Sequence, residues 1–251
     1  MSAAGPLGMS LRGWSAWTPG LTAPAAWLTW ARGGVAARRE TAPPALGEFP
    51  PLLRRRADRM GRAALHVLTR PELPYTGQAI VMCSRLGEIG RSFGLQKELA
   101  SEGSVSPQQF GMSVHHAIGG LFMMAKKARV PLTALAAGEE GALAGLQEAA
   151  AQLADGAGIL WLLFCEEPLP TEYRSFAASP EDGTDHYAFV LELAAGDEFR
   201  LAKDAEHAAP ATRRVASPLD LLAFLLCPSD DAIRLSPRGG WTLCRAGRKL
   251  A

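Results

Sequence analysis

The chain has 251 residues, 48% of them hydrophobic, and a formal net charge of +1. This length suits one domain or one domain with appendages, and the apolar content is ample for a buried core. The near-neutral charge argues against a general nucleic-acid-binding protein, which would carry an excess of lysine and arginine. No apolar run approaches the roughly 20 residues that span a bilayer, and the N-terminus lacks the pattern of a secretory signal. We therefore expect no membrane span and a cytoplasmic location.

Four cysteines, Cys83, Cys165, Cys227 and Cys244, are spread widely along the chain. Cys83 and Cys165 lie in apolar runs, which is typical of buried free thiols rather than of disulfides. Neither a C-x-x-C nor an H-E-x-x-H pattern is present. The sequence therefore predicts no metal site and no cofactor.

The N-terminal part of the chain predicts a strand over Leu11–Thr18 and a proline-rich linker over residues 42–51. A helix is expected from Leu52 to Leu68, because apolar residues recur there at three- and four-residue steps. Arginines crowd the remaining faces of this helix: Arg54, Arg55, Arg56, Arg59 and Arg62.

A short apolar run bounded by turn signals, Gln78–Ser84, predicts a buried strand, and Ile89–Ala100 is expected to form the next helix. Arg85 and Glu88 lie between these two elements and have opposite charges. We expect an ion pair between them at the end of the strand.

The central stretch of the chain predicts a strand that runs directly into a helix. Gln108–Val114 mixes polar and apolar residues, as a half-exposed strand does, and helical spacing begins at His115. Gly119 and Gly120 lie inside this helix, where glycine costs roughly 1 kcal/mol relative to alanine, which predicts that the helix backbone is pressed closely against something else. Many enzymes carry their nucleophile in the first turn of such a helix, because this turn has free N–H groups and a partial positive charge.

The next elements repeat a strand–helix–strand pattern. A strand is expected over Thr133–Ala137, a helix along the apolar stripe Leu143–Leu153, and a strand over Ile159–Cys165. The last run is uninterruptedly apolar, which is typical of parallel strands covered on both faces. Together these units predict an α/β fold with right-handed crossovers.

Two adjacent carboxylates, Glu166 and Glu167, follow the apolar strand. Adjacent residues on an extended chain point to opposite sides, so we interpret them as solvated or hydrogen-bonded loop carboxylates rather than a paired acid site. Further on, Tyr187–Leu193 and Glu198–Lys203 are expected to pair as a hairpin.

The C-terminal quarter predicts one helix and a last pair of strands. The sequence Ser217-Pro218-Leu219-Asp220 is typical of a helix start. Short strands are expected over Ile233–Leu235 and Gly240–Arg245.

Two segments resemble a known family. The motif Ser113-Val114-His115-His116-Ala117, with the glycine-bearing helix after it, resembles the nucleophile elbow of β-ketoacyl synthases. The segment Ser84-Arg85-Leu86-Gly87-Glu88 resembles one that recurs in their chain length factors. The resemblance, clearest from Val81 to Pro170, is to the β-ketoacyl synthase chain length factors of aryl polyene pathways.

This resemblance implies one thiolase-like half, an N-terminal ketosynthase-like domain with a mixed sheet covered by helices. A single domain over residues 1–251 is expected, with its core at about 11–193 and a C-terminal extension over 194–251. In active relatives the third residue of the elbow motif is the reactive cysteine; here it is His115. The second half of those enzymes supplies two further histidines, and nothing in this chain matches their motifs. The resemblance therefore implies a subunit without catalytic residues.

By the same resemblance, the chain forms a heterodimer with an active β-ketoacyl-ACP synthase, stabilises it and shapes the length of its acyl product. The strand before the elbow pairs across the two-fold axis in ketosynthase dimers. The residues expected at this partner interface are Gln108, Gln109, Phe110, Gly111, Met112, Ser113, Val114, His115 and His116.

Alternatives stay open at this point. The arginines Arg54, Arg55, Arg56 and Arg59 form either a solvated helix face or a docking site for an acidic acyl carrier protein. The chain could also be a stand-alone acyl-thioester transferase or hydrolase that uses His115, His116 or Cys83. A third alternative is a carrier-binding module without a synthase partner.

Overall fold

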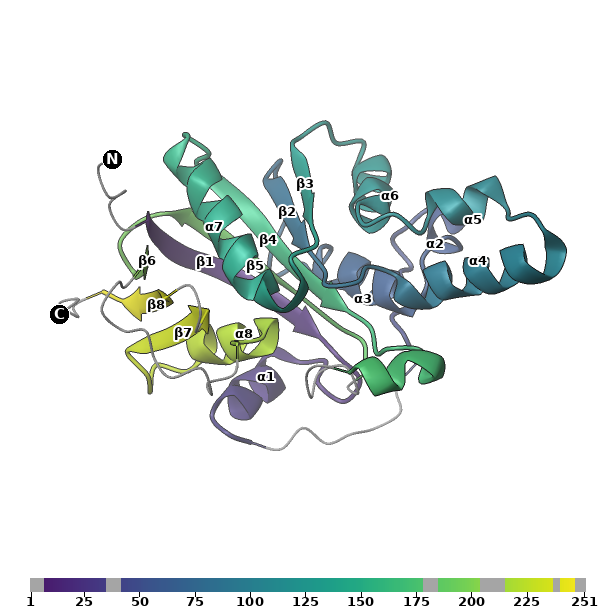
Figure 1. Ribbon diagram of the computed structural model, residues 1–251. Helices are drawn as coiled ribbons and strands as arrows, with labels where there is room; N and C mark the ends of the chain where they lie inside the picture. Colours follow the sequence, from purple (N-terminus) through teal and green to yellow (C-terminus); the bar gives the residue numbers. More distant parts are fainter. Residues whose placement is uncertain (1–6, 35–41, 178–184, 204–214, 237–239, 247–251) are drawn as a thin grey trace.

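The computed structural model describes residues 7–34, 42–177, 185–203, 215–236 and 240–246. Within these residues, one mixed sheet has the strand order β3-β2-β4-β5-β1-β6-β8-β7 (Figure 1). Its strands are β1 (Leu7–Trp17), β2 (Ala79–Cys83), β3 (Leu132–Leu135), β4 (Ile159–Glu166), β5 (Tyr187–Ala195), β6 (Phe199–Lys203), β7 (Ala232–Ser236) and β8 (Trp241–Arg245). The helices are α1 (Pro24–Ala31), α2 (Pro51–Arg54), α3 (Arg59–Val67), α4 (Ile89–Glu102), α5 (Pro107–Gly111), α6 (Ala117–Lys126), α7 (Gly141–Ala154) and α8 (Pro218–Leu226), with 3₁₀ turns η1 (Gly138–Glu140) and η2 (Thr171–Phe176).

The sheet has a parallel part and an antiparallel part. β2 lies between β3 and β4 and pairs with both in parallel. From β4 onward, each neighbouring pair is antiparallel. Parallel strands separated by helices confirm the predicted α/β class.

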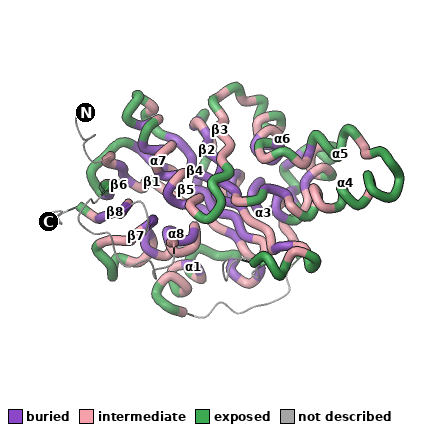
Figure 2. The backbone as a smooth tube through the Cα atoms, in the orientation of Figure 1, coloured by how far each residue is buried: buried purple, intermediate pink, exposed green. Residues whose placement is uncertain are grey.

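Strand β4 shows why its sequence is apolar throughout. Leu160, Leu162 and Phe164 belong to the core beneath α7 and α8, whereas Trp161 and Leu163 belong to the core beneath α3 and α6. Successive side chains point to opposite faces of a sheet, so a strand covered on both faces needs apolar residues at every position. The prediction for this segment is confirmed (Figure 2).

The predicted hairpin of β5 and β6 is wrong. β1 lies between them, pairing with β5 along Met9–Trp17 and with β6 along Leu7–Met9. With eleven residues, β1 is long enough to pair with both neighbouring strands. Strands that adjoin in sequence are therefore separated in the sheet by a strand from the other end of the chain.

The helix expected over Leu52–Leu68 is two helices. Helix α2 ends at Arg54 and α3 begins at Arg59, because Asp58 caps α3 by accepting a hydrogen bond from the Gly61 N–H (2.8 Å). An aspartate at this position favours a new helix start over continuation of the previous helix.

The C-terminal predictions are confirmed within the described residues. The Ser217 hydroxyl accepts from the Asp220 N–H (3.1 Å), and the Asp220 carboxylate accepts from the Ser217 N–H (2.9 Å), which is a capping box at the start of α8. Strands β7 and β8 pair antiparallel. With β6 they extend the sheet beyond Leu193.

Candidate functional site

The expected strand over Gln108–Val114 is wrong. Residues from Pro107 to Gly111 form helix α5, and a turn leads to α6. The Ser106 hydroxyl accepts from the Gln109 N–H (3.4 Å), and Pro107 occupies the first helical position. Serine followed by proline is a strong helix start, although the polar–apolar alternation of the next residues is typical of a half-exposed strand.

His115 lies in the turn before α6, and the exposed His116 is the N-cap of that helix. The His115 ring lies against Gly87, where an added Cβ would come within 3.3 Å of its Cε1 atom. Its Nε2 atom is buried and has no hydrogen-bond partner among the described residues. A histidine that acts as a nucleophile or base needs an orienting partner, and the contacts described here supply none to Nε2.

The loop after β2 is held by the two adjacent carboxylates. Glu166 Oε1 accepts from the Arg85 N–H (2.6 Å), and Glu167 Oε1 accepts from the Gly90 N–H (2.7 Å). Glu167 also lies 3.5 Å from His186 Nε2. The interpretation of this pair as hydrogen-bonded loop carboxylates is confirmed, and the two acids point to different partners.

The Glu88 side chain contacts Arg91 instead of the expected Arg85. Its carboxylate lies 3.1 Å from Arg91 Nε, one helical turn further on. The carboxyl group is 3% exposed, and burial, followed by the neighbouring Asp58 carboxylate, raises its pKa to about 9. Arg91 also donates to Gln109 Oε1 (2.6 Å), so this network joins α4 to α5.

The strand that runs into a helix at the sheet edge is β3, followed by α7. After Leu135 the chain passes through Ala136 and Ala137 into the turn η1, and α7 begins at Gly141. Gly138 has a φ of +57°, a conformation that favours glycine. Residues 136–141 read AAGEEG. No thiol, hydroxyl or imidazole therefore lies at the junction.

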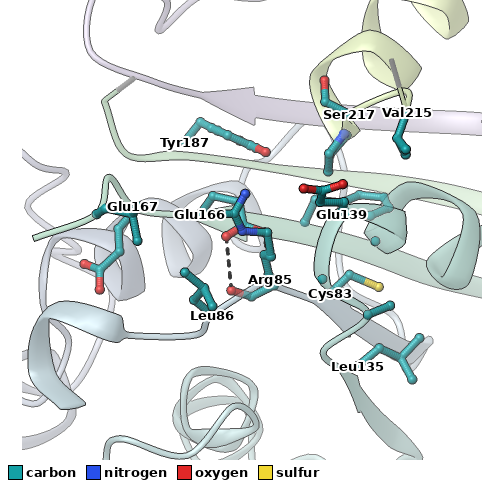
Figure 3. Close-up of a pocket in the computed structure, with 17 residues that line it drawn as sticks. Cys83, Arg85, Leu86, Leu135, Glu139, Glu166, Glu167, Tyr187, Val215 and Ser217 are labelled. Atoms are coloured by element: carbon teal, nitrogen blue, oxygen red, sulfur yellow. Dashed lines mark hydrogen bonds between the residues drawn. The ribbon is translucent and has the colours of Figure 1, made fainter. Parts of the chain in front are cut away.

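A cavity of about 90 Å³ opens beside this junction (Figure 3). Cys83 and Phe164 line it from the C-terminal ends of parallel strands, and Glu139 lines it from the junction. Ligands of open α/β sheets commonly bind at this end of the strands. The cavity has room for a few ordered waters. Its lining includes the carboxylates of Glu139, Glu166 and Glu167, whereas the thiol of Cys83 is buried.

The buried thiols are poor nucleophiles. Burial raises the pKa of Cys83 to about 12 and that of Cys165 well above its usual value. The thiolate is the reactive form of cysteine, so both groups stay protonated near neutral pH. The prediction of buried free thiols is confirmed for Cys83 and Cys165, and Cys227 and Cys244 are also free.

The arginines of α2 and α3 divide into structural and exposed groups. Arg62 donates to the carbonyls of Pro44 (3.2 Å) and Arg54 (3.3 Å), which ties α3 to the end of α2 and to the chain before it. Arg55 and Arg59 are exposed. Two of the predicted docking residues are thus available to a partner.

Among the described residues, no group of three or more metal-ligating side chains is close enough to hold an ion. In the same part of the chain, no helix has the length and apolar character needed to cross a bilayer.

The mixed sheet with helices on both faces and an edge strand that leads into a helix is the architecture of a thiolase-like ketosynthase half, as the sequence predicted. Residues 27–242 match the family described as Beta-ketoacyl synthase, N-terminal domain. The chain belongs to this family.

Solved structures share this fold. One chain of the ketosynthase ApeO in complex with its chain length factor ApeC, from Xenorhabdus doucetiae, is 24% identical with a TM-score of 0.79, over 95% of this chain and 100% of that chain. The ishigamide ketosynthase/chain length factor is 16% identical with a TM-score of 0.60, over 80% and 69% of the two chains. A β-ketoacyl synthase from Burkholderia phymatum is 14% identical with a TM-score of 0.56, over 87% and 70%. No curated protein sequence matches the chain.

Proposed function

We propose that this chain is a ketosynthase-like subunit that does not itself catalyse condensation and that pairs with an active β-ketoacyl-ACP synthase. In this role it acts in the cytoplasm as a single domain, stabilises the synthase and shapes the length of an aryl polyene-type product. Similarity of fold to a ketosynthase–chain length factor complex supports the proposal.

The observation that carries the proposal is the lack of a nucleophile at either candidate position. The β3–α7 junction reads AAGEEG. His115, the third residue of the motif that resembles the elbow, lies in the turn before α6, and its Nε2 atom is buried without a partner in the described structure. Condensation requires a group that carries the acyl chain, and neither position offers a thiol.

We propose two contributions to the partner interface. The first is the segment Gln108–His116, now as helix α5 and the following turn, where Phe110 is 60% exposed. The second is the open edge of β3, because β3 ends the sheet and also precedes a helix. Pairing across the two-fold axis, the role that the resemblance gives to the strand before the elbow, therefore fits β3 better than the segment in α5.

We also propose that the exposed arginines beside this interface attract an acidic acyl carrier protein. Arg54, Arg55, Arg56 and Arg59 are the residues concerned, and Arg55 and Arg59 are exposed. Reversal of the Arg59 charge with Arg59→Glu should weaken carrier binding to the complex several-fold, whereas Arg12→Glu, at an exposed position of β1, is the matched control. Equal binding by all three proteins would contradict this role.

Co-expression with the full-length synthase encoded nearest to this chain tests the pairing. We expect a stable complex whose mass equals one copy of each chain, and condensation of malonyl thioesters by the complex but not by this chain alone. Turnover of an acyl thioester by the isolated chain, abolished by His115→Ala, would instead establish the stand-alone transferase or hydrolase.

A further inference from the structure

Two adjoining hollows lie on the outer surface of α5 and α6. Their volumes are about 320 and 310 Å³, and both are lined by Arg56, Gln108 and Met112. We call them together the α5–α6 groove. The other lining residues are Leu52, Arg55, Arg91, Gln109, Pro107, Gly111, His116, Ala117, Gly120 and Met124.

The floor of the groove is made of small residues that the fold does not require. A Cβ added at Gly111 or Gly120 would meet nothing within 4 Å. By contrast, a Cβ at the neighbouring Gly119 would come within 2.8 Å of Leu132, so that glycine permits α6 to pack on β3. Glycine inside a helix costs about 1 kcal/mol relative to alanine. Contacts within the described chain explain this cost at Gly119 but not at Gly120.

Large apolar side chains are exposed around the groove. Leu52 is 68% exposed, Phe110 60% and Met124 52%. With Val114 they make up half of the eight large hydrophobic residues that are exposed in the described structure. Such a concentration is typical of a surface that binds another protein, and permanent subunit interfaces are the more apolar class.

The charges at the groove have one sign. No aspartate or glutamate of the described chain lines either hollow. Arg91 lies 3.8 Å from the Asp58 carboxylate and donates to Glu88, whereas no ion pair of the described residues involves Arg55 or Arg56. The rim therefore favours carboxylates supplied by a partner.

We propose that the α5–α6 groove receives an acidic amphipathic helix of the partner synthase, with a bulky apolar side chain against Gly111 and Gly120 and carboxylates facing Arg55 and Arg56. This inference rests on the proposed function, because it names the surface by which the two subunits associate. The exposed apolar side chains of Leu52, Phe110 and Met124 favour the permanent partner over a transiently bound carrier protein.

The test fills the groove without disturbing the fold. Gly120→Leu places a side chain in the space that the partner would occupy, and Gly94→Leu makes the same change on the exposed face of α4, where an added Cβ also meets nothing. Both variants should melt at or above the temperature of the unchanged protein, because leucine is a better helix former. We expect Gly120→Leu to weaken binding to the synthase at least 10-fold and Gly94→Leu to leave it unchanged.

A second variant, Arg55→Glu with Arg56→Glu, keeps the test decisive if Gly120→Leu folds poorly. It should weaken association and remove its salt dependence. Full-affinity binding by the folded variants would overturn the groove assignment and leave the pairing of the subunits intact. Loss of carrier binding alone, with the synthase complex unchanged, would also overturn it. Failure of the unchanged chain to bind the synthase would instead refute the proposed function.

Discussion

Substitution of Glu88 by glutamine should increase the stability of the protein at neutral and mildly alkaline pH. The Glu88 carboxyl group is 3% exposed, hydrogen-bonds to Asp58 and lies 3.1 Å from Arg91 Nε. Burial raises its pKa from 4.5 to about 9, so the folded protein keeps the proton that the unfolded chain releases above pH 4.5. Glutamine has the same shape, donates from its amide to Asp58 and accepts from Arg91.

The magnitude follows from proton linkage. A folded-state pKa above the unfolded value means that the contribution to stability is greatest below about pH 4.5 and is lost as the pH rises towards about 9. Holding the proton at pH 7 costs up to about 3 kcal/mol, at roughly 1.4 kcal/mol for each pH unit above the unfolded pKa. Glu88→Gln removes this cost, so we expect a gain of about 1–3 kcal/mol at pH 7 and no gain near pH 4.5.

Urea unfolding followed by circular dichroism, at several pH values between about 4.5 and about 8.5, measures this difference. Glu172→Gln is the control, because that carboxylate is exposed and its hydrogen bond with Lys97 lowers its pKa. If Glu88→Gln is instead destabilising at the alkaline end, Glu88 is ionised in the folded protein and its main partner is the Arg91 guanidinium. The buried carboxyl group would then be an ion pair rather than a proton shared with Asp58.

Three further predictions concern packing and local structure. In the native protein at neutral pH, iodoacetamide should label Cys227, which is half-exposed and whose pKa is lowered by its hydrogen bond with Ser229. Cys83 should stay unmodified until urea is added. Rapid labelling of Cys83 in the native protein would contradict its burial. Ser217→Ala removes one side of the capping box of α8 and should lower the free energy of unfolding by about 1 kcal/mol, which urea titration detects. Gly145→Ala would place a Cβ 2.8 Å from the Cys83 sulfur and should destabilise the protein by about 1–3 kcal/mol. Gly94→Ala is the control and should be neutral or stabilising. An unchanged melting temperature of Gly145→Ala would show that the contact between α7 and the sheet is looser than described.

The parts of the fold that the sequence could predict are those set by local chemistry. The apolar run of β4 reports burial on both faces, and Ser217 with Asp220 reports a helix start, because capping needs only residues three positions apart. The position of β1 between β5 and β6 could not be predicted in this way. It depends on pairing such as Trp14 with Leu191, which no local pattern encodes.

The candidate site was predicted less well, for a similar reason. Gly119 and Gly120 were both expected to lie close against something: Gly119 lies against Leu132 of β3, whereas an added Cβ at Gly120 would meet nothing in the described structure. Residues 107–111 instead form a short helix that is exposed throughout, and the buried Met112 lies in the turn after it. Glu88 contacts Arg91 rather than Arg85 because the side chains of Glu88 and Arg91, three positions apart, lie on the same side of the first turn of α4.

The open edge of β3 offers a last test of how the subunits meet. β3 has a described neighbour on one side only, β2, and no charged residue within it, although open edges usually carry a charge or a bulge that prevents pairing. The Pro131 and Leu135 carbonyls accept hydrogen bonds from β2, so alternate residues Leu132 and Ala134 direct their backbone groups away from it. Ala134→Pro removes an outward N–H and should preserve the fold but abolish the synthase complex, whereas Thr133→Pro removes an inward one and should lower the melting temperature. A complex that forms normally with Ala134→Pro would rule out strand pairing at β3 and leave the α5–α6 groove as the contact between the subunits.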